Sequence, residues 1–142
     1  MTDVHSKEKR SFNMSRIRAK DTKPEIVVRK YLHARGFRYR LHVKQLPGKP
    51  DIVLPRYKTV IFIHGCFWHG HAGCAVFKMP KSNTEFWENK ISGNIMRDET
   101  AAKLLAGSGY KVLTIWECEL SGVEKRKLSL QRLAEEILNE KR

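Results

Sequence analysis

Residues 50–64 read PDIVLPRYKTVIFIH, and this stretch decides the expected fold. Two β-rich runs, PDIVL and TVIFIH, are separated by PRYK, which is the pattern of an antiparallel hairpin. If the turn is centred just after Tyr57, Asp51 lies opposite His64, and Cβ atoms in such a pair are about 5 Å apart. An acid and an imidazole would then meet on one face of the sheet. In the alternative interpretation, Asp51 only ends the preceding turn PGKP.

A helix is predicted before the hairpin, over residues 21–36 (DTKPEIVVRKYLHARG). Thr22 and Glu25 have the spacing of a capping box, Pro24 suits the first turn, and Gly36 can end the helix. The side chains that form its apolar face are Val27, Val28, Tyr31 and Leu32.

Three further elements are predicted after the hairpin. Residues 82–109 form either one long helix or two abutting helices with a weak point at Gly93, and residues 111–120 form a strand. A last helix in residues 127–142 keeps a helical period of apolar side chains at Leu130, Leu133, Ile137 and Leu138. The predicted fold is therefore of the α/β or α+β class, with helices flanking a mixed sheet.

The length and charge of the chain indicate one basic domain. With 142 residues we expect a single domain over 1–142, made of a basic arm at 1–20 and a core at 21–142. The net charge of +13 is typical of a protein that binds a polyanion such as nucleic acid, although some small proteins are simply basic.

The composition also argues against two other classes of protein. No apolar run reaches the about 20 residues of a membrane helix, and the first residues lack the apolar core of a signal peptide. Three cysteines cannot all pair within one chain, which argues against a secreted disulfide scaffold. We therefore expect a cytoplasmic protein with no membrane partner.

The segment 61–74, IFIHGCFWHGHAGC, has the spacing of metal ligands. Four residues separate its first cysteine from a histidine, and two separate that histidine from the second cysteine. With the third cysteine of the chain, a closed tetrahedral Cys3His site is predicted, which is the structural kind of zinc site. The ligands would be Cys66, His71, Cys74 and Cys118. Three buried free thiols are the alternative.

Asp98 interrupts an apolar stripe on the predicted helix, whose other members are Trp87, Ile91, Ile95, Ala102 and Leu105. A carboxylate facing the core is costly unless a group donates to it. A histidine is the natural partner, because the acid would orient the ring and raise its basicity. The pattern equally allows Asp98 to cap a second helix.

Two histidines and the adjacent pair Phe67 and Trp68 of the same segment remain outside the predicted zinc site. His64 and His69 can do acid–base work near Asp51, where Mg²⁺ suits a carboxylate. Phe67 and Trp68 can stack on bases or wedge between them, although core packing is the ordinary role of such side chains.

Taken in order, these residues resemble the very short patch repair (Vsr) mismatch endonuclease family. The matching strings are DVHSKEKRSFNM, DTKPE, LPGKPDIV, IFIHGCFWHGH, EFW, RD and WECEL, which run from Asp3 to Leu120. The resemblance implies a restriction-endonuclease-like fold and Mg²⁺-dependent nicking of double-stranded DNA, 5′ of the thymine in a T·G mispair. Such mispairs arise when 5-methylcytosine deaminates at the site of a DNA cytosine methyltransferase.

The resemblance also implies roles for individual residues. Asp51 matches the metal-binding carboxylate, His69 the proposed general base and Asp98 the acid that orients it. Glu25 and His64 match further active-site residues, and the four Cys and His residues match the structural zinc ligands. The residues that match the DNA wedge and the minor-groove contacts are Phe67, Trp68, Trp87, Met14 and Ile17.

One departure from related nucleases concerns the second strand of the hairpin. These nucleases usually carry an acidic-x-Lys motif there, whereas this chain has Phe62-Ile63-His64. The second Mg²⁺ ligand would then be a backbone carbonyl, for which we choose Ile63.

Two rival functions stay open at this level. One is a nuclease of the same fold that cuts unmispaired DNA, and the other is a non-catalytic zinc module that binds nucleic acid. We expect a monomer, because one nick needs one active site, in a bacterial cytoplasm and associated with the nucleoid when acting. A functional link to mismatch-repair proteins is a further expectation.

Overall fold

The predicted hairpin forms the middle of a four-stranded sheet. The computed structural model describes residues 22–71, 73–74 and 79–139, and in it β2 (Ile52–Leu54) runs antiparallel to β3 (Thr59–His64). The short β1 (Arg40–Leu41) pairs antiparallel with β2, and β4 (Lys111–Trp116) pairs parallel with β3. The sheet order is β1-β2-β3-β4, so the prediction of a mixed sheet is confirmed.

The hairpin register differs from the prediction by two residues. Ile52 pairs with Ile61, so the register does not place Asp51 opposite His64. The reason is the turn, because the 3-10 turn η1 (Pro55–Tyr57) is followed by Lys58 in the left-handed region at φ +51°, and together they take up four residues. Since side chains alternate with period two, a shift of two residues leaves each one on its predicted face.

The first helix, α2 (Lys23–Ala34), has the predicted capping box. The Thr22 hydroxyl accepts from the backbone N–H of Glu25, and the Glu25 carboxylate accepts from the backbone N–H of Thr22. Val28 and Leu32 are fully buried, and Val27 and Tyr31 pack against the same core, as predicted.

The long helix α3 (Thr84–Gly107) is a single element that passes through Gly93 without a break. Asp98 therefore lies inside the helix, and its alternative role as the cap of a second helix is wrong. Ile91 and Leu105 on the same stripe are buried, so this face of α3 packs against the protein.

Two predictions about the end of the chain are wrong. The strand stops at Trp116, and Cys118 lies on the 3-10 turn η2 (Glu117–Leu120), because Glu119 accepts a hydrogen bond from the Trp116 backbone N–H and turns the chain. The helix α4 (Val123–Leu138) begins four residues before the predicted start. Its residue Leu138 is 50% exposed, and Ala134 is buried on that face instead.

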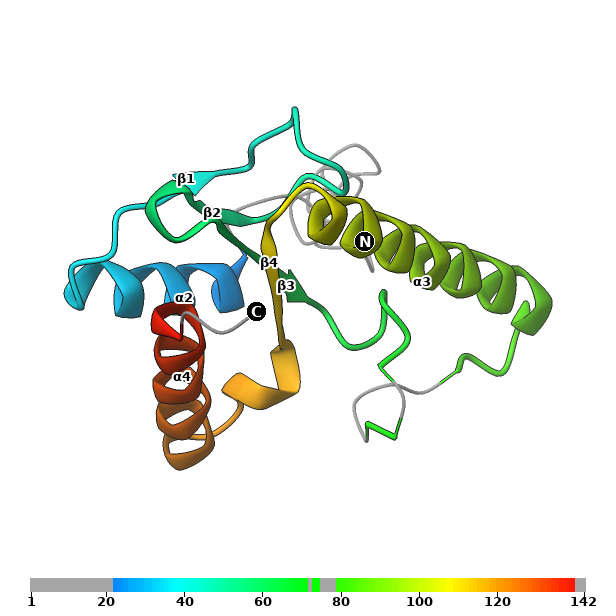
Figure 1. Cartoon of the computed structure of the whole chain (residues 1–142). Coiled ribbons are helices and arrows are strands. Elements are labelled where there is room, and N and C mark those ends of the chain that lie inside the picture. The colour runs from blue at the N-terminus through cyan, green and yellow to red at the C-terminus, as the bar shows by residue number, and fades with distance from the viewer. Residues whose placement is uncertain (1–21, 72, 75–78, 140–142) are drawn as a thin grey trace, which may run out of the picture.

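Helices cover both faces of the sheet, as Figure 1 shows. The helices α2 and α4 lie together against one face, where the larger apolar core is built around Leu32, Ile61 and Leu133. The helix α3 lies on the opposite side, where a smaller core includes Phe62 and Leu105. By strand alternation His64 shares the face of Phe62, which directs it toward α3. Among the described residues no helix is long and apolar enough to cross a membrane.

Candidate active site and metal centre

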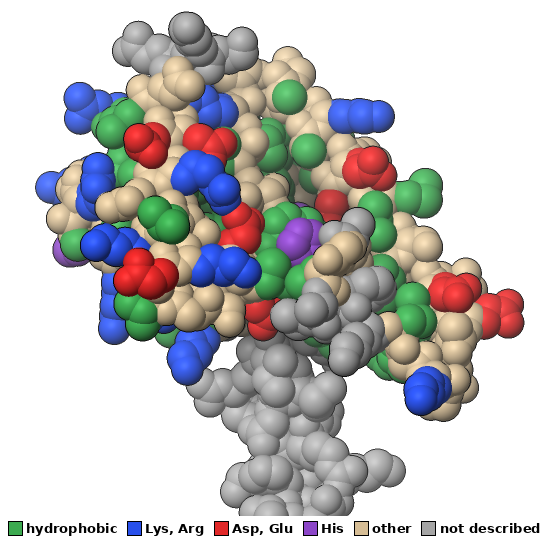
Figure 2. Space-filling model, turned by 90° about the horizontal axis from the view of Figure 1, so that it is seen from below, with side chains coloured by type: hydrophobic (Ala, Val, Ile, Leu, Met, Phe, Trp, Pro, Cys, Tyr) green, Lys and Arg blue, Asp and Glu red, His purple; other side chains and the backbone are tan. Residues whose placement is uncertain are grey.

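A cleft of about 650 Å³ lies where β3 ends and the following loop turns toward α3. Its walls come from the start of α2, from Asp51, from residues 62–65 and 67–69, and from α3. Figure 2 shows lysine and arginine side chains spread over this view of the molecule, interspersed with acidic and hydrophobic side chains. The lining combines apolar side chains with four carboxylates and three lysines, so it can offer oxygen ligands to a cation and positive charge to an anionic ligand.

Asp51 lies at the cleft as a partly buried carboxylate. Its Oδ2 accepts a hydrogen bond of 2.7 Å from the backbone N–H of Ile63 on β3. Burial raises the pKa of Asp51 from 3.8 to about 6, against the opposing effect of that hydrogen bond. The two residues predicted as Mg²⁺ ligands, Asp51 and Ile63, are thus in direct contact. Carboxylate and carbonyl oxygens are ligands that this hard cation takes, so the donor types present are compatible with Mg²⁺.

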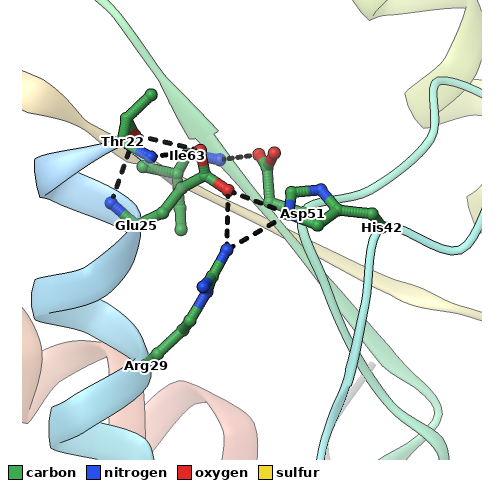
Figure 3. A network of polar contacts seen from close by, with 6 residues as sticks. All are labelled: Thr22, Glu25, Arg29, His42, Asp51 and Ile63. Atoms are coloured by element: carbon green, nitrogen blue, oxygen red, sulfur yellow. Dashed lines mark hydrogen bonds and ion pairs between the residues drawn. The ribbon is translucent and has the colours of Figure 1, made fainter. Parts of the chain in front are cut away.

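Glu25 belongs both to the helix cap, whose contacts Figure 3 shows, and to the lining of the cleft. Its side chain is 4% exposed, and Oε2 accepts from the Thr22 hydroxyl at 3.0 Å. Oε1 accepts from Arg29 Nη2 at 3.3 Å, and the same nitrogen lies 3.1 Å from His42 Nε2. The capping role that the sequence left open is therefore real, and it coexists with a position in the cleft.

Arg29 and His42 were not singled out from the sequence. Nε2 of His42 lies 3.1 Å from Arg29 Nη2 and 3.4 Å from Glu25 Oε1, so the imidazole completes a three-membered polar network with that ion pair. Donor atoms of Glu25, His42 and Asp51 all lie within 4.8 Å of one another. The spacing of Glu25 and Arg29, four residues apart on one helix, was the available signal for their ion pair.

His69 and Asp98 form a hydrogen-bonded pair. His69 Nδ1 lies 2.6 Å from Asp98 Oδ2, and both side chains are partly exposed in the cleft. Asp98 thus meets a histidine, as the sequence argument expected of an acid on an apolar stripe. Because the acid holds Nδ1, the opposite ring nitrogen of His69 is left to act on a ligand.

His64 is stacked against His69. The two ring centroids are 3.8 Å apart and the planes differ by 4°. His64 is 7% exposed, and burial lowers its pKa from 6.5 to about 4, an effect that neighbouring His69 reinforces. His64 is therefore neutral at physiological pH. Its Nε2 lies 4.0 Å from Asp98 Oδ1, while the buried Nδ1 has no hydrogen-bond partner among the described residues.

The predicted zinc ligands come together in a second cluster. Donor atoms of Cys66, His71, Cys74 and Cys118 all lie within 4.8 Å of one another. Three thiols and one imidazole are a donor set of structural zinc sites, so the cluster is compatible with zinc. Burial raises the pKa of the Cys66 thiol to about 12, which keeps it protonated at neutral pH in the metal-free protein. Ligation would therefore release protons.

Contacts around the cysteine cluster fix its loop. Cys66 donates its backbone N–H to the Glu117 carboxylate at 3.2 Å, and the His71 ring stacks on Trp116 with centroids 3.9 Å apart. Both partners come from the WECEL segment, which thereby joins the loop to the end of β4. The signal that could have identified Glu117 was its place beside Cys118 in that motif.

Three aromatic rings form a cluster at the cleft. Phe67 lies edge-on to Trp68 at 5.1 Å and to Trp87 at 5.4 Å, and the two tryptophan rings are 5.8 Å apart. Phe67 and Trp68 line the cleft beside the two histidines. The basic arm, with Met14 and Ile17, lies outside the described residues.

A family model of the DNA mismatch endonuclease Vsr matches residues 2–75, just over half of the chain. The chain belongs to this family. It is 52% identical over 137 residues to the type II nicking enzyme V.NmeAIP of Neisseria meningitidis, covering 96% of this chain and 97% of that relative. The DNA mismatch endonuclease Vsr of Escherichia coli K12 is 46% identical over 125 residues, 88% of this chain and 80% of the relative. This protein is therefore a DNA endonuclease of the Vsr type.

Proposed function

We propose that this Vsr-type endonuclease nicks double-stranded DNA 5′ of the thymine in T·G mispairs left by deamination of 5-methylcytosine, and so initiates very short patch repair. One observation carries the proposal. The His69–Asp98 pair and the Asp51 carboxylate open into one cleft, and the aromatic cluster of Phe67 and Trp68 opens into it beside them. A group that can move a proton thus lies next to rings that can enter a base stack.

Asp51 and the backbone carbonyl of Ile63 are the groups that would hold Mg²⁺. When bound, this ion would supply positive charge to the scissile phosphodiester and to the leaving oxygen. The Ile63 N–H holds Oδ2 of Asp51, which orients the carboxylate so that its other oxygen can meet the cation. Glu25, fixed by Thr22 and Arg29, would stand beside Asp51 and orient water.

His69 is the proposed general base. Asp98 holds Nδ1, so Nε2 carries the lone pair that takes a proton from the attacking water, and the imidazolium formed is stabilised by the adjacent carboxylate. The stacked His64 is neutral, so it adds no positive charge against that imidazolium. Its part is to hold the His69 ring plane.

Recognition of the mispair is assigned to the aromatic cluster and to the basic arm. Phe67, Trp68 and Trp87 would wedge into the stack, which costs less at a mispaired step than in regular DNA. Met14 and Ile17, on the basic arm, would reach the minor groove. A zinc ion on the Cys3His cluster would stiffen the loop that carries both the wedge and His69.

The wider proposal places a restriction-endonuclease-like core at 21–142 and a DNA-contacting arm at 1–20 in one domain that acts as a monomer. Its substrates would arise at the sites of a DNA cytosine methyltransferase, which links the enzyme functionally to that activity and to mismatch-repair proteins. The mixed sheet with helices on both faces supports the proposed core.

The test is a nicking assay on two duplexes that differ only in one base pair, T·G or T·A, with and without Mg²⁺. We expect Mg²⁺-dependent nicking of the T·G duplex alone, on the thymine strand. Equal cutting of both duplexes would instead support a nuclease for unmispaired DNA. Several relatives carry the name type II nicking enzyme, so this comparison decides between two real alternatives.

A further inference from the structure

The helix α3 holds two consecutive residues of the loop after β3. Asn94 donates from Nδ2 to the backbone carbonyl of Trp68 at 2.8 Å, and Asp98 binds His69 Nδ1 at 2.6 Å. Asn94 and Asp98 are four residues apart, so they lie one above the other on the same helix face. The helix therefore binds the wedge residue and the proposed base next to it at the same time.

The contact of Asn94 fixes a peptide plane that both residues share. The carbonyl of Trp68 and the N–H of His69 belong to one planar peptide unit. Asn94 holds its oxygen, and the carbonyl of Gly65 accepts from its N–H at 3.2 Å. A displacement of the Trp68 backbone therefore tilts the plane from which the His69 side chain departs.

The orientation of the Asn94 amide is determined by Arg97. The Arg97 guanidinium contacts Asn94 Oδ1, and because a guanidinium has only donors, the amide oxygen must face it. The amide nitrogen then faces Trp68. This assignment excludes a flipped amide, in which oxygen would oppose the carbonyl oxygen of Trp68.

The next residue of the loop, Gly70, packs closely against the same helix. Gly70 has φ +58°, and a Cβ atom added there would lie 2.7 Å from Ile91 and 2.8 Å from Ile95. Trp87, also on α3, contacts the rings of Phe67 and Trp68. The loop from Phe67 to Gly70 is thus held along its length by one helix face.

We propose that Asn94 is a positioning residue that couples the seating of the aromatic wedge to the placement of His69. This inference rests on the proposed function, since it assumes that the wedge enters mispaired DNA. When the wedge seats beside a T·G pair, the Asn94 bond keeps the shared peptide plane, and hence His69, in the cutting position. Without that hydrogen bond the wedge can still enter the DNA beside the T·G pair, but the position of His69 is no longer fixed.

The test compares Asn94→Ala with Asn89→Ala, which makes the same change at an exposed position of α3. Single-turnover nicking is measured over a range of enzyme concentrations on the T·G duplex. For Asn94→Ala we expect a maximal rate lower by about fivefold, the factor of one typical net hydrogen bond, at an unchanged half-saturating concentration. For Asn89→Ala we expect wild-type values.

A second measurement uses the DNA-free protein. The indole N–H signal of Trp68, identified by its loss in Trp68→Phe, should shift or broaden in ¹H–¹⁵N spectra of Asn94→Ala and stay unchanged in Asn89→Ala. If Asn94→Ala does not fold, Asn94→Asp keeps the size and the acceptor for Arg97 but removes the donor. Asn89→Asp then controls for the added charge.

Three outcomes overturn the proposal. They are a wild-type maximal rate in the Asn94 variants, a change confined to the half-saturating concentration, and an unmoved Trp68 signal. The second would mean that Asn94 contacts DNA rather than the loop. Failure of the proposed function is seen separately, in the wild-type enzyme, as equal nicking of the T·G and T·A duplexes.

Discussion

Replacing Asp51 with asparagine is expected to abolish nicking and yet to stabilise the magnesium-free protein. Burial raises the pKa of Asp51 from 3.8 to about 6, so the ionised carboxylate at neutral pH opposes folding. At about 1.36 kcal/mol per pKa unit the upper limit of this cost is about 3 kcal/mol. Because Asp51 is partly exposed, solvent screening reduces the expected gain to about 1–2 kcal/mol. Asparagine keeps an acceptor for the Ile63 N–H.

The sign of the pH dependence follows from the raised pKa. Between about pH 4 and pH 6 the folded protein holds the Asp51 proton more tightly than the unfolded chain does. The proton on Asp51 therefore stabilises the folded wild type fully below pH 3.8, and this stabilisation is lost as the pH rises through 6. The variant lacks this group, so its advantage should be largest above pH 7 and should vanish near pH 4.

Urea unfolding of both proteins at pH 4.5, 6 and 7.5 in magnesium-free, zinc-replete buffer measures this difference. Mg²⁺ should stabilise only the wild type. Asp51→Ala, which also leaves the Ile63 N–H without its acceptor, should be less stable than Asp51→Asn while retaining mismatch binding. The reasoning is refuted if Asp51→Asn is less stable than the wild type at pH 7.5, or if the difference does not change with pH.

Three other substitutions test the remaining parts of the site. His69→Ala should lower the single-turnover rate on the T·G duplex by about 10²–10⁴-fold without weakening DNA binding, and full activity would exclude His69 as the base. Cys118→Ser should lower the bound zinc, measured by atomic absorption, and should lower the melting temperature, whereas an unchanged zinc content would exclude Cys118 as a ligand. Gly70→Ala should destabilise the protein by about 1–3 kcal/mol in urea unfolding, because the added Cβ would lie 2.7 Å from Ile91 and φ is +58°. An unchanged free energy of unfolding would show that the loop does not pack tightly against α3.

The elements that follow local rules were predictable from the sequence. The capping box of Thr22 and Glu25 depends on residues three apart, and the burial of Ile91 and Leu105 on one face of α3 depends only on the helical period. The hairpin was predictable in kind but not in register. The register depends on how many residues the turn takes up, and the left-handed Lys58 is not marked by a glycine or an asparagine.

Contacts between distant segments were not predictable in the same way. Arg29 meets His42 across 13 positions, and His42 reaches it from a left-handed backbone at φ +49° that no common turn pattern announces. Asn94 and Trp68 are 26 positions apart. The four zinc-type ligands could be chosen because cysteine is scarce in this chain, although their strand context was wrong for Cys118.

The order of residues in the segment from His64 to His71 has a consequence for its evolution. A metal-type ligand, two wedge residues, the proposed base and the glycine that packs on α3 follow one another without a gap, as Cys66, Phe67, Trp68, His69 and Gly70. A single inserted or deleted residue would move each side chain into the place of its neighbour. Substitutions in this segment are therefore tolerated more easily than insertions or deletions. Homologous chains should align across it without gaps.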